Sequence, residues 1–549
     1  MSRREAWLTA LGVFAVAVVV RAWAASLVSF PIPEDATYYW GVARNLVEGR
    51  GLVSDALWSY GTPARDPVTG AFGLFHPRPA FEIWLPLATF LGAIPMAIAG
   101  STDPGVAAPV PVVLGALIPV LTWRIAADVA EERALPPGRA RTVAVGAGLV
   151  AAVYLPLVLP SALLDSTVAF GLPALAACLL MVRLAREPRG ARALDPRVLV
   201  LGVAIGVAFL SRNEAAWLGL AWAIVAWWTT GLTAAVRIRW IAIAGAVALA
   251  VASPWLLRDW LVFGSPLPGQ AAANALSLSG FDIFAWHDPP TLARYLAAGP
   301  EAWLGTRVDG LAHNLQNVLA VPGFPVAAIG LVALPWCGRD RALRPLLLAG
   351  AITFLVTSLL FPVATTWGTF LHAAVPVQVL LVVVAVVATD AAIARVGVFR
   401  GWHRPVAWLG PLFLGLAAVL FTTLGLPAYG RQAAAVAARY AELPARLAAA
   451  GEPLRPGMPV ISDFPIWLAE TARVPTLALP DEPPADVLDL ARTFGARLLV
   501  IERDDHGRWP AVLAGDDPAA GCFQEIDLPA TTLDDRAARG LRAFRIGCP

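Results

Sequence analysis

The chain alternates long apolar segments with short polar loops, and this alternation predicts its architecture. Eleven segments are almost continuously apolar, and most are close to the length that a helix needs to cross the hydrocarbon core of a bilayer. We predict spans at residues 7–29, 106–125, 142–160, 163–182, 198–211, 214–231, 240–256, 320–336, 345–362, 371–389 and 405–426. The pattern therefore predicts a polytopic α-helical membrane protein with about eleven transmembrane helices.

One further apolar stretch, residues 80–99, decides which side of the membrane each loop faces. It contains Pro86 and Pro95, and it is either another span or an interfacial or re-entrant segment. If it does not cross, five arginine-rich loops share the side of Arg3 and Arg4, as the positive-inside rule requires; if it crosses, all five move outside. We therefore predict that it does not cross. The N-terminus is then cytoplasmic and the C-terminus lies outside the plasma membrane.

This topology places three polar segments outside: residues 31–105, residues 258–319, and everything after residue 426. The second is long and aromatic, so we expect helices that cover the membrane surface rather than a bare loop. Beyond residue 426 the pattern changes to a helical stretch followed by alternating strand-like and helix-like runs. We predict a transmembrane domain over 1–426 and a small extracytoplasmic α/β domain over 427–549.

The last two predicted strands, residues 522–528 and 541–548, each carry a cysteine at one end. If they pair as antiparallel neighbours, Cys522 and Cys548 lie at the same end of the ladder. An oxidising exterior then permits a disulfide between them. No cysteine or histidine cluster has the spacing of a zinc site.

Composition supports the membrane prediction and limits the chemistry. The 549 residues are 58% hydrophobic and 15% charged, with a mean hydropathy of +0.67, which excludes a water-soluble globule. A net charge of +2 is too small to indicate binding to nucleic acid. All 41 basic residues are arginines, so guanidinium groups, backbone N–H groups or a metal must hold any phosphate. An alanine-rich chain without lysine favours a bacterial source.

Residues 31–52, directly after the first span, combine an acidic pair with helical periodicity. Glu34 and Asp35 precede apolar residues at the spacing of an amphipathic helix, which we expect to lie on the membrane surface: Tyr39, Val42, Ala43, Leu46 and Val47. Two interpretations of Asp35 remain open. It caps the helix, as aspartate often does, or it carries chemistry where membrane meets water.

Other polar residues gather at the predicted outer ends of the spans. They are His76, Arg78, Asp165, Arg212, Glu214, Arg258 and His372. Each one taken singly reads as a snorkelling or capping residue. Together, carboxylates facing arginines and histidines on one side of the membrane suit a reaction on an anionic lipid head group, because guanidinium forks bind phosphate.

The sequence resembles the GT-C superfamily of integral-membrane glycosyltransferases, in particular the branch with protein O-mannosyltransferases and lipid A aminoarabinose transferases. The similar segments are EDATYYWGVARNLVEGRGL, HPRP, Asp165 near a span start, PWLLRDWLVFGSPLP and GTFLHAAVP. Two features depart from the superfamily pattern. The acidic pair is Glu-Asp, where relatives commonly have Asp-Glu or Asp-Asp, and the HPRP segment lacks the lysine of some relatives.

The resemblance implies an inverting transfer of a sugar from a polyprenyl-phosphate donor to an acceptor hydroxyl on a glycan, lipid or protein at the outer face. It assigns the catalytic base to Asp35, with Glu34 orienting the acceptor or sharing the proton. Arg258 stabilises the leaving phosphate, with Arg78 and Arg212 as further candidates. Other site candidates are His76, Asp165, Glu214 and His372. With arginines present, we expect no obligatory divalent metal.

Two alternatives from other classes compete with an enzyme. A secondary transporter also has many spans and intramembrane charges, and a non-catalytic envelope-assembly protein could keep the same fold. Transporters often contain inverted repeats with sites at mid-membrane. This chain shows no visible repeat, its charges lie in the outer layer, and it carries a large external domain, so the pattern favours chemistry at the membrane surface.

Overall fold

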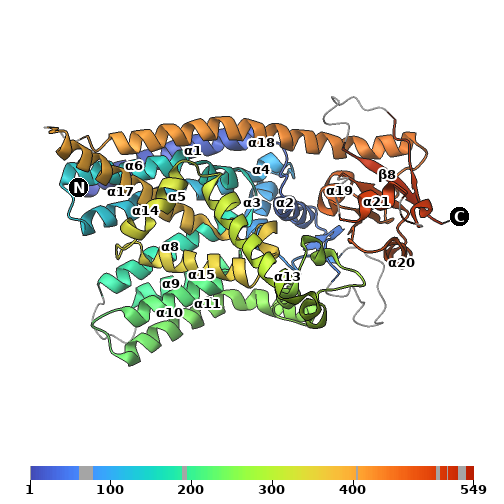
Figure 1. Cartoon of the computed structure of the whole chain (residues 1–549), viewed down its shortest axis with the longest axis horizontal. Helices are drawn as coiled ribbons and strands as arrows, with labels where there is room; N and C mark the ends of the chain where they lie inside the picture. The colour runs from blue at the N-terminus through green and yellow to red at the C-terminus, as the bar shows by residue number, and fades with distance from the viewer. Residues whose placement is uncertain are drawn as a thin grey trace.

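The computed structural model describes residues 2–60, 78–187, 195–402, 406–502, 507–515, 517, 519–529 and 540–548. Figure 1 shows a long helical bundle with the N-terminus at one end and a small mixed α/β region at the other. The prediction of a polytopic helical protein with a C-terminal α/β region is confirmed.

Each predicted span is a helix or, in one case, a broken helix. The bundle consists of α1 (Arg3–Leu27), α5 (Pro109–Glu132), α6 (Pro137–Val153), α7 (Leu155–Val158), α8 (Ser166–Arg186), α9 (Pro196–Phe209), α10 (Ala215–Trp228), α11 (Ala234–Phe263), α14 (Val326–Cys337), α15 (Arg344–Leu359), α17 (Val375–Phe399) and α18 (Leu409–Ala449). Among the described residues, six helices are long and apolar enough to cross a bilayer, and a bent pair makes a seventh. The chain is a multi-pass membrane protein. The number of eleven spans stays a prediction, because α9, α10, α14 and α15 are shorter.

Ion pairs bring the arginine-rich loops together at the end of the bundle that lies opposite the sheet. Arg133 contacts Asp340 at 2.7 Å, which joins the loop after α5 to the loop after α14. Arg186, at the end of α8, contacts Glu132 at 2.9 Å. In the same region Arg139 contacts Asp390 of α17 at 2.7 Å. These loops therefore share one side, as the arginine pattern predicts.

The stretch 80–99 stays at the other end of the bundle. Its helix α3 (Leu87–Ala99) has 13 residues, a length of about 20 Å, which is short of the roughly 30 Å of a bilayer core. The Leu87 N–H donates to the carbonyl of Leu210 at the end of α9. Beyond α3, the indole of Trp40 donates to the carbonyl of Thr102 at 2.9 Å. The segment thus begins and ends in the same layer and does not traverse the bundle.

The break between α6 and α7 frees backbone carbonyls inside the bundle, and an arginine of α1 binds them. The two pieces meet at 68°, and Pro156 lacks the N–H that would continue the helical ladder. Arg21 is fully buried and donates to the carbonyls of Ala152 and Leu157, each at 3.1 Å, and to Ser161 Oγ at 3.1 Å. A buried charge is therefore matched by acceptors that the broken helix leaves unpaired.

The C-terminal region is built on a six-stranded sheet of order β2-β5-β4-β6-β8-β7. Its strands are β2 (Ala56–Leu57), β4 (Val460–Ser462), β5 (Thr476–Ala478), β6 (Leu498–Ile501), β7 (Phe523–Glu525) and β8 (Arg542–Ile546). The first four run parallel, and β8 is antiparallel to β6 and β7. Strand β2 comes from the segment 31–105, so the predicted domain 427–549 shares its sheet with residues far away in sequence. The 41-residue helix α18 connects this region to the bundle.

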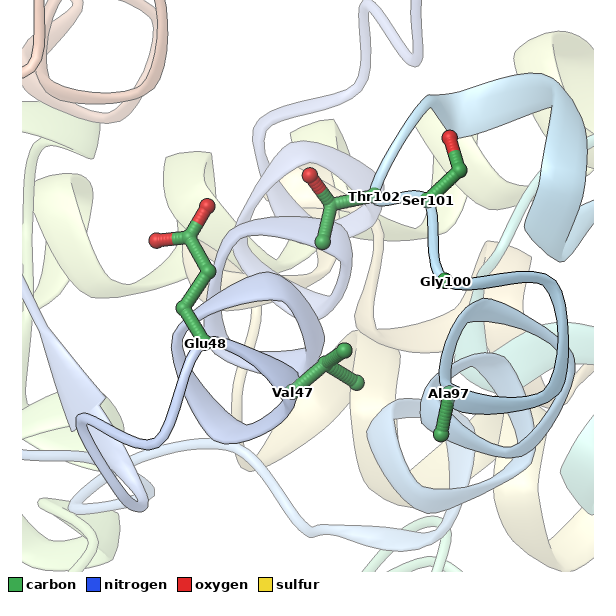
Figure 2. Close-up of a pocket in the computed structure, with 6 residues that line it drawn as sticks. All are labelled: Val47, Glu48, Ala97, Gly100, Ser101 and Thr102. Carbon is green, nitrogen blue, oxygen red and sulfur yellow. The ribbon is translucent and has the colours of Figure 1, made fainter.

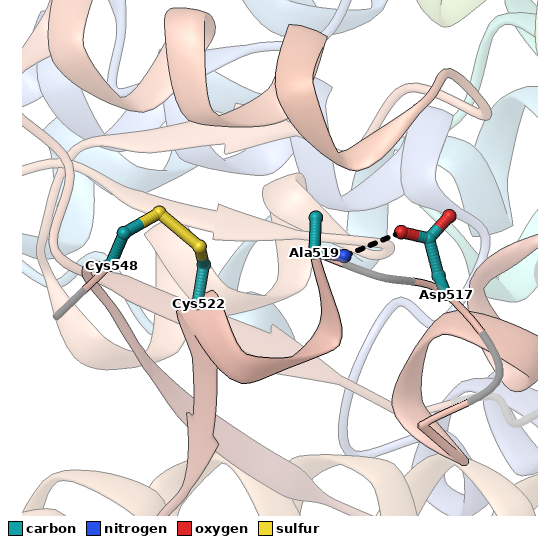
Figure 3. The surroundings of a disulfide bond; sticks show 4 residues. All are labelled: Asp517, Ala519, Cys522 and Cys548. Carbon is teal, nitrogen blue, oxygen red and sulfur yellow. Dashed lines mark hydrogen bonds between the residues drawn. A yellow bond between two sulfur atoms is a disulfide. The ribbon is translucent and has the colours of Figure 1, made fainter.

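A disulfide joins Cys522 to Cys548, as the strand pairing predicts, and Figure 3 shows its surroundings. Strands β7 and β8 are antiparallel, with Phe523 opposite Ile546, so the cysteines that flank them lie at the same end. Their Cα atoms are 4.2 Å apart.

Thiol labelling tests this bond. In denatured but unreduced protein we expect only Cys178 and Cys337 to react, because both are free thiols that become accessible on unfolding. After reduction all 4 cysteines should react. Labelling of Cys522 or Cys548 without reductant would contradict the bridge, and mass spectrometry of the labelled peptides reads the result directly.

Candidate active site

The acidic pair begins helix α2 (Glu34–Val47), which lies between the bundle and the C-terminal region. Its N-cap is Pro33, with no side-chain cap, so the interpretation of Asp35 as the capping residue is wrong. The helix is also buried from Ala36 to Asn45, rather than on one face only. Helix α19 (Pro465–Ala472) covers its second face, and Gly41 permits the close approach, because a Cβ there would collide with the carboxylate of Glu470.

Asp35 faces a histidine that contacts a second aspartate. Asp35 Oδ2 lies 3.2 Å from His372 Nε2, and His372 Nδ1 lies 3.0 Å from Asp165 Oδ2. His372 belongs to the short helix α16 (Thr369–Ala373), and Asp165 is the residue just before α8. The Thr167 hydroxyl donates to Asp165 Oδ2 at 2.7 Å and fixes that carboxylate. The result is a carboxylate, an imidazole and a carboxylate in series, assembled from three separate parts of the chain.

Arg212 and Glu214 complete this cluster from the turn between α9 and α10. Arg212 holds Glu214 with two hydrogen bonds, of 2.9 and 3.1 Å, and donates to Ser166 Oγ at 3.0 Å. Burial raises the pKa of Asp35, and the charge of Arg212 partly opposes that rise. The structure therefore brings Asp35, Asp165, Arg212, Glu214 and His372 into one neighbourhood, as predicted.

Glu34 and Asp35 have different environments although they are adjacent. The Trp58 indole and the Ile466 backbone N–H each donate to Glu34 at 3.3 Å. Burial raises the pKa of Glu34 to about 8, so most of this carboxyl is protonated at neutral pH. Burial also raises the pKa of Asp35, but the facing His372 opposes that rise. Glu34 can therefore donate a hydrogen bond at neutral pH, whereas Asp35 faces an imidazole.

The raised pKa of Glu34 predicts a pH dependence of stability. Its folded pKa of about 8 exceeds the ordinary value of 4.5, so the folded state binds an extra proton between these values. The contribution of this group to stability is present at low pH and is lost as pH rises from about 4.5 to 8. We expect Glu34→Gln to flatten that decline in thermal unfolding measured across the same range.

Glu48→Gln is the matched control for Glu34→Gln. Glu48 ends α2 and binds Arg473, which lowers the pKa of Glu48, so the sign of its contribution is opposite. Its replacement should leave the decline between pH 5 and 8 in place. An unchanged slope in Glu34→Gln would show that Glu34 is ionised in the folded protein at neutral pH.

The other predicted phosphate ligands lie near Tyr38, about one turn of α2 after Asp35. Arg258 pairs with Asp259 at 2.8 Å, and its guanidinium lies 4.8 Å from the ring centre of Trp255. Arg258 and Arg78 both act on the pKa of Tyr38, which places them near that residue. Their roles stay predictions, and His76 lies outside the described residues. Arg212 is the arginine whose charge is among the largest effects on the pKa of Asp35.

An open groove lies at the far end of α2. Its volume is about 660 Å³ between the ends of α2 and α3, and Figure 2 shows its lining by Val47, Glu48, Ala97, Gly100, Ser101 and Thr102. Glu48 is thirteen positions from Asp35 along the helix axis, a distance of about 20 Å, so the groove is separate from the acids. In the described parts of the chain, no three His, Cys, Asp or Glu side chains are arranged to hold a metal ion.

Comparison with known proteins identifies the fold. No protein-family model and no curated protein sequence matches the chain. ArnT from Cupriavidus metallidurans bound to undecaprenyl phosphate superposes with a TM-score of 0.55 at 13% identity, covering 98% of this chain and 98% of that one. The Archaeoglobus fulgidus oligosaccharyltransferase in complex with Zn and sulfate gives 0.53 at 14% identity, over 93% and 71% of the two chains. The archaeal oligosaccharyltransferase AglB from Archaeoglobus fulgidus, in complex with an inhibitory peptide and a dolichol-phosphate, gives a TM-score of 0.50 at 14% identity, over 96% and 73% of the two chains.

The chain is a multi-pass helical bundle with a sheet region at one end, and its acid and imidazole cluster lies on a buried helix between the two. More particularly, the fold is that of the GT-C glycosyltransferases.

The structure adds partners that sequence reasoning missed. Thr167 and Ser166 orient Asp165, Trp58 donates to Glu34, and Trp84 donates to Asp35. The hydroxyl residues directly follow Asp165 in sequence, so their contact with its carboxylate could have been predicted. Trp58 and Trp84 lie in loops, and the hydrophobic periodicity of the sequence does not predict the path of a loop.

Proposed function

We propose that the protein is an inverting glycosyltransferase that moves a sugar from a polyprenyl-phosphate donor to an acceptor hydroxyl at the outer membrane face. The observation that carries the proposal is the contact of Asp35 with His372, which Asp165 holds from the opposite ring nitrogen. This arrangement supplies a positioned base, and it lies where the bundle meets the external domain.

In this reaction the Asp35 carboxylate accepts the proton of the acceptor hydroxyl. The hydroxyl oxygen bonds to the anomeric carbon as the bond from that carbon to the phosphate oxygen breaks, on the opposite face. The departing lipid phosphate gains a second negative charge, which guanidinium groups stabilise. Glu34, protonated at neutral pH, orients the acceptor, and His372 holds Asp35 in position between the two reactants.

The donor class is supported by the solved structures of similar fold. ArnT was solved with undecaprenyl phosphate and the archaeal oligosaccharyltransferase with a dolichol-phosphate. A lipid phosphate suits this chain as well, because arginines near Asp35 and near Tyr38 offer guanidinium groups to it. The acceptor in this proposal is a glycan, lipid or protein outside the cell membrane, and the N-terminus is cytoplasmic.

The direct test is transfer of a labelled sugar from a synthetic polyprenyl-phosphate donor by the purified full-length protein. We expect release of the lipid phosphate and capture of the label by an envelope fraction. A transporter would move the donor without cleaving it, and an assembly protein would bind it unchanged, so intact donor at every time point would refute the enzyme. Activity after exhaustive chelation tests our proposal that no divalent metal is obligatory.

Substitution of Arg258 tests its assignment to the leaving phosphate. Arg258→Ala should remove a charge-assisted hydrogen bond of about 1.5 to 3 kcal/mol and raise the donor KM or lower kcat accordingly. Arg473→Ala serves as the control, because Arg473 lies on the exposed surface and pairs with Glu48. A loss in Arg212→Ala with none in Arg258→Ala would instead place the phosphate beside the Asp35 cluster.

A further inference from the structure

The two adjacent acids of α2 are held by different parts of the protein. Successive positions of a helix point about 100° apart, so Glu34 and Asp35 leave α2 in different directions. Asp35 meets His372 of α16, which lies between the bundle helices α15 and α17. Glu34 instead accepts hydrogen bonds from the Trp58 indole and the Ile466 backbone N–H, each at 3.3 Å. Both of these donors belong to the six-stranded sheet and α19, which together form the sheet region.

The two donors lie at the same edge of the sheet. Trp58 directly follows β2, and Ile466 lies in the first turn of α19, which follows β4. Both strands run parallel to β5, in a register that ends them at nearly the same level. Parallel sheets commonly hold their ligands at this carboxyl edge. In this protein the group held there is the carboxyl of Glu34.

Packing fixes both the indole donor and the helix that it faces. Trp58 is only 9% exposed, and its ring centre lies 5.0 Å from that of Trp84 and 5.2 Å from that of Phe284. Helix α19 lies beside α2 (Figure 1), and the buried pair of Arg44 and Glu470 joins the two helices at 2.7 Å. The Trp58 N–H therefore has a fixed direction relative to the start of α2.

The charged groups that act most on Glu34 are carboxylates. Asp35 of α2 and Asp463, at the end of β4, both raise the pKa of Glu34, as burial does. Tyr440 of α18 faces the same carboxyl, because the charge of Glu34 raises the pKa of Tyr440. The two N–H groups from the sheet region act in the opposite direction and lower the pKa of Glu34. The sheet region thus influences both the position and the ionisation of this acid.

We propose that the sheet region is part of the catalytic unit and that Trp58 is a positioning residue, whose indole N–H holds the Glu34 carboxyl toward the acceptor. The sheet region then positions one acid of the pair, and the bundle positions the other. The proposal rests on the glycosyltransferase function proposed above for the role of Glu34 in transfer, whereas the contact itself is testable without any substrate.

The first test is thermal unfolding of the full-length protein in detergent, measured from about pH 5 to 10. Trp58→Phe keeps an aromatic ring and removes the N–H, so the folded pKa of Glu34 should rise further. The decline in stability that Glu34 causes should then extend to a pH about one unit higher than in the wild type. Glu34→Gln added to Trp58→Phe should remove this extension, because the effect acts through Glu34.

Trp40→Phe is the matched control. Trp40 is 8% exposed, and its indole donates to the backbone carbonyl of Thr102 rather than to an acid. Its replacement should leave the pH range of the decline unchanged. As a second variant, 3-benzothienylalanine introduced at position 58 has a sulfur where indole has the N–H and keeps the shape of the ring. It should reproduce the shift of Trp58→Phe even where the smaller phenyl ring loosens the packing.

The second test is the transfer assay. Trp58→Phe should raise the acceptor KM about fivefold and leave the donor KM unchanged, because Glu34 orients the acceptor. An unchanged pH range of unfolding in both variants at position 58, or an equal rise in both KM values, would overturn the proposal. Transfer by the wild type with an unchanged range overturns this inference alone. A shifted range with no transfer by the wild type overturns the proposed function alone and keeps Trp58 as the residue that positions Glu34.

Discussion

Asp35→Asn is expected to abolish sugar transfer while the protein still folds. The amide keeps the size of the side chain but cannot accept the hydroxyl proton, and a positioned general base accounts for about 10² to 10⁴ in rate. The Asp35 side chain is only 20% exposed, but asparagine has the same size, so the substitution leaves the packing around it in place. Initial rates with a labelled polyprenyl-phosphate donor, together with size-exclusion and thermal unfolding profiles, measure both quantities.

Asp103→Asn is the matched control for this substitution. Asp103 lies in the same external segment and accepts the Gly105 N–H at 2.8 Å, a capping role that asparagine also fills. We expect its rate to equal that of the wild type. Turnover by Asp35→Asn within a few-fold of that control would remove Asp35 from the mechanism.

His372→Ala is expected to lower transfer at neutral pH by roughly 10²-fold, because Asp35 loses the contact that positions it and becomes more protonated. His372 lowers the pKa of Asp35, so its removal raises that pKa. More of Asp35 is then protonated at neutral pH, and the acidic limb of the kcat/KM profile moves to higher pH. Part of the lost rate should return as the pH is raised, which a purely structural histidine would not produce.

Asp165→Asn provides a second measurement on the same contact. Because Asp165 acts on Asp35 through His372, the double variant with His372→Ala should lose little more than His372→Ala alone. His313→Ala, on helix α13 (Leu292–His313), should retain full activity. Additive losses in the double variant, or a pH profile unchanged in shape, would argue that the two residues act independently.

Much of the fold was predictable because hydrophobic runs and arginine placement are strong local signals. The positions of the bundle helices follow from apolar runs, and the non-crossing of residues 80–99 follows from the shared side of the arginine loops. The helix α20 (Pro484–Phe494) and the final hairpin were readable from periodicity for the same reason. These features depend on residues near one another in sequence.

What sequence could not show is which distant segments meet. Strand β2 joins a sheet whose other strands lie about four hundred positions later in the sequence. Only two of its residues pair, which is too few to show the alternating pattern of a strand. The burial of α2 on both faces depends on α19 in the same way. The neighbourhood of Asp35 was predicted by counting spans, but the direct contact with His372 depends on the turn before α17, which spacing does not describe.

The guanidinium of Arg21 has a consequence for biogenesis. Its acceptors on Ala152 and Ser161 lie 131 and 140 residues further along the chain. A ribosome must therefore complete at least three more hydrophobic helices before the first one can satisfy its charge. Until then the carbonyl of Ala17, within the same helix, is the one acceptor of Arg21 among these contacts that has been synthesised, at 3.4 Å.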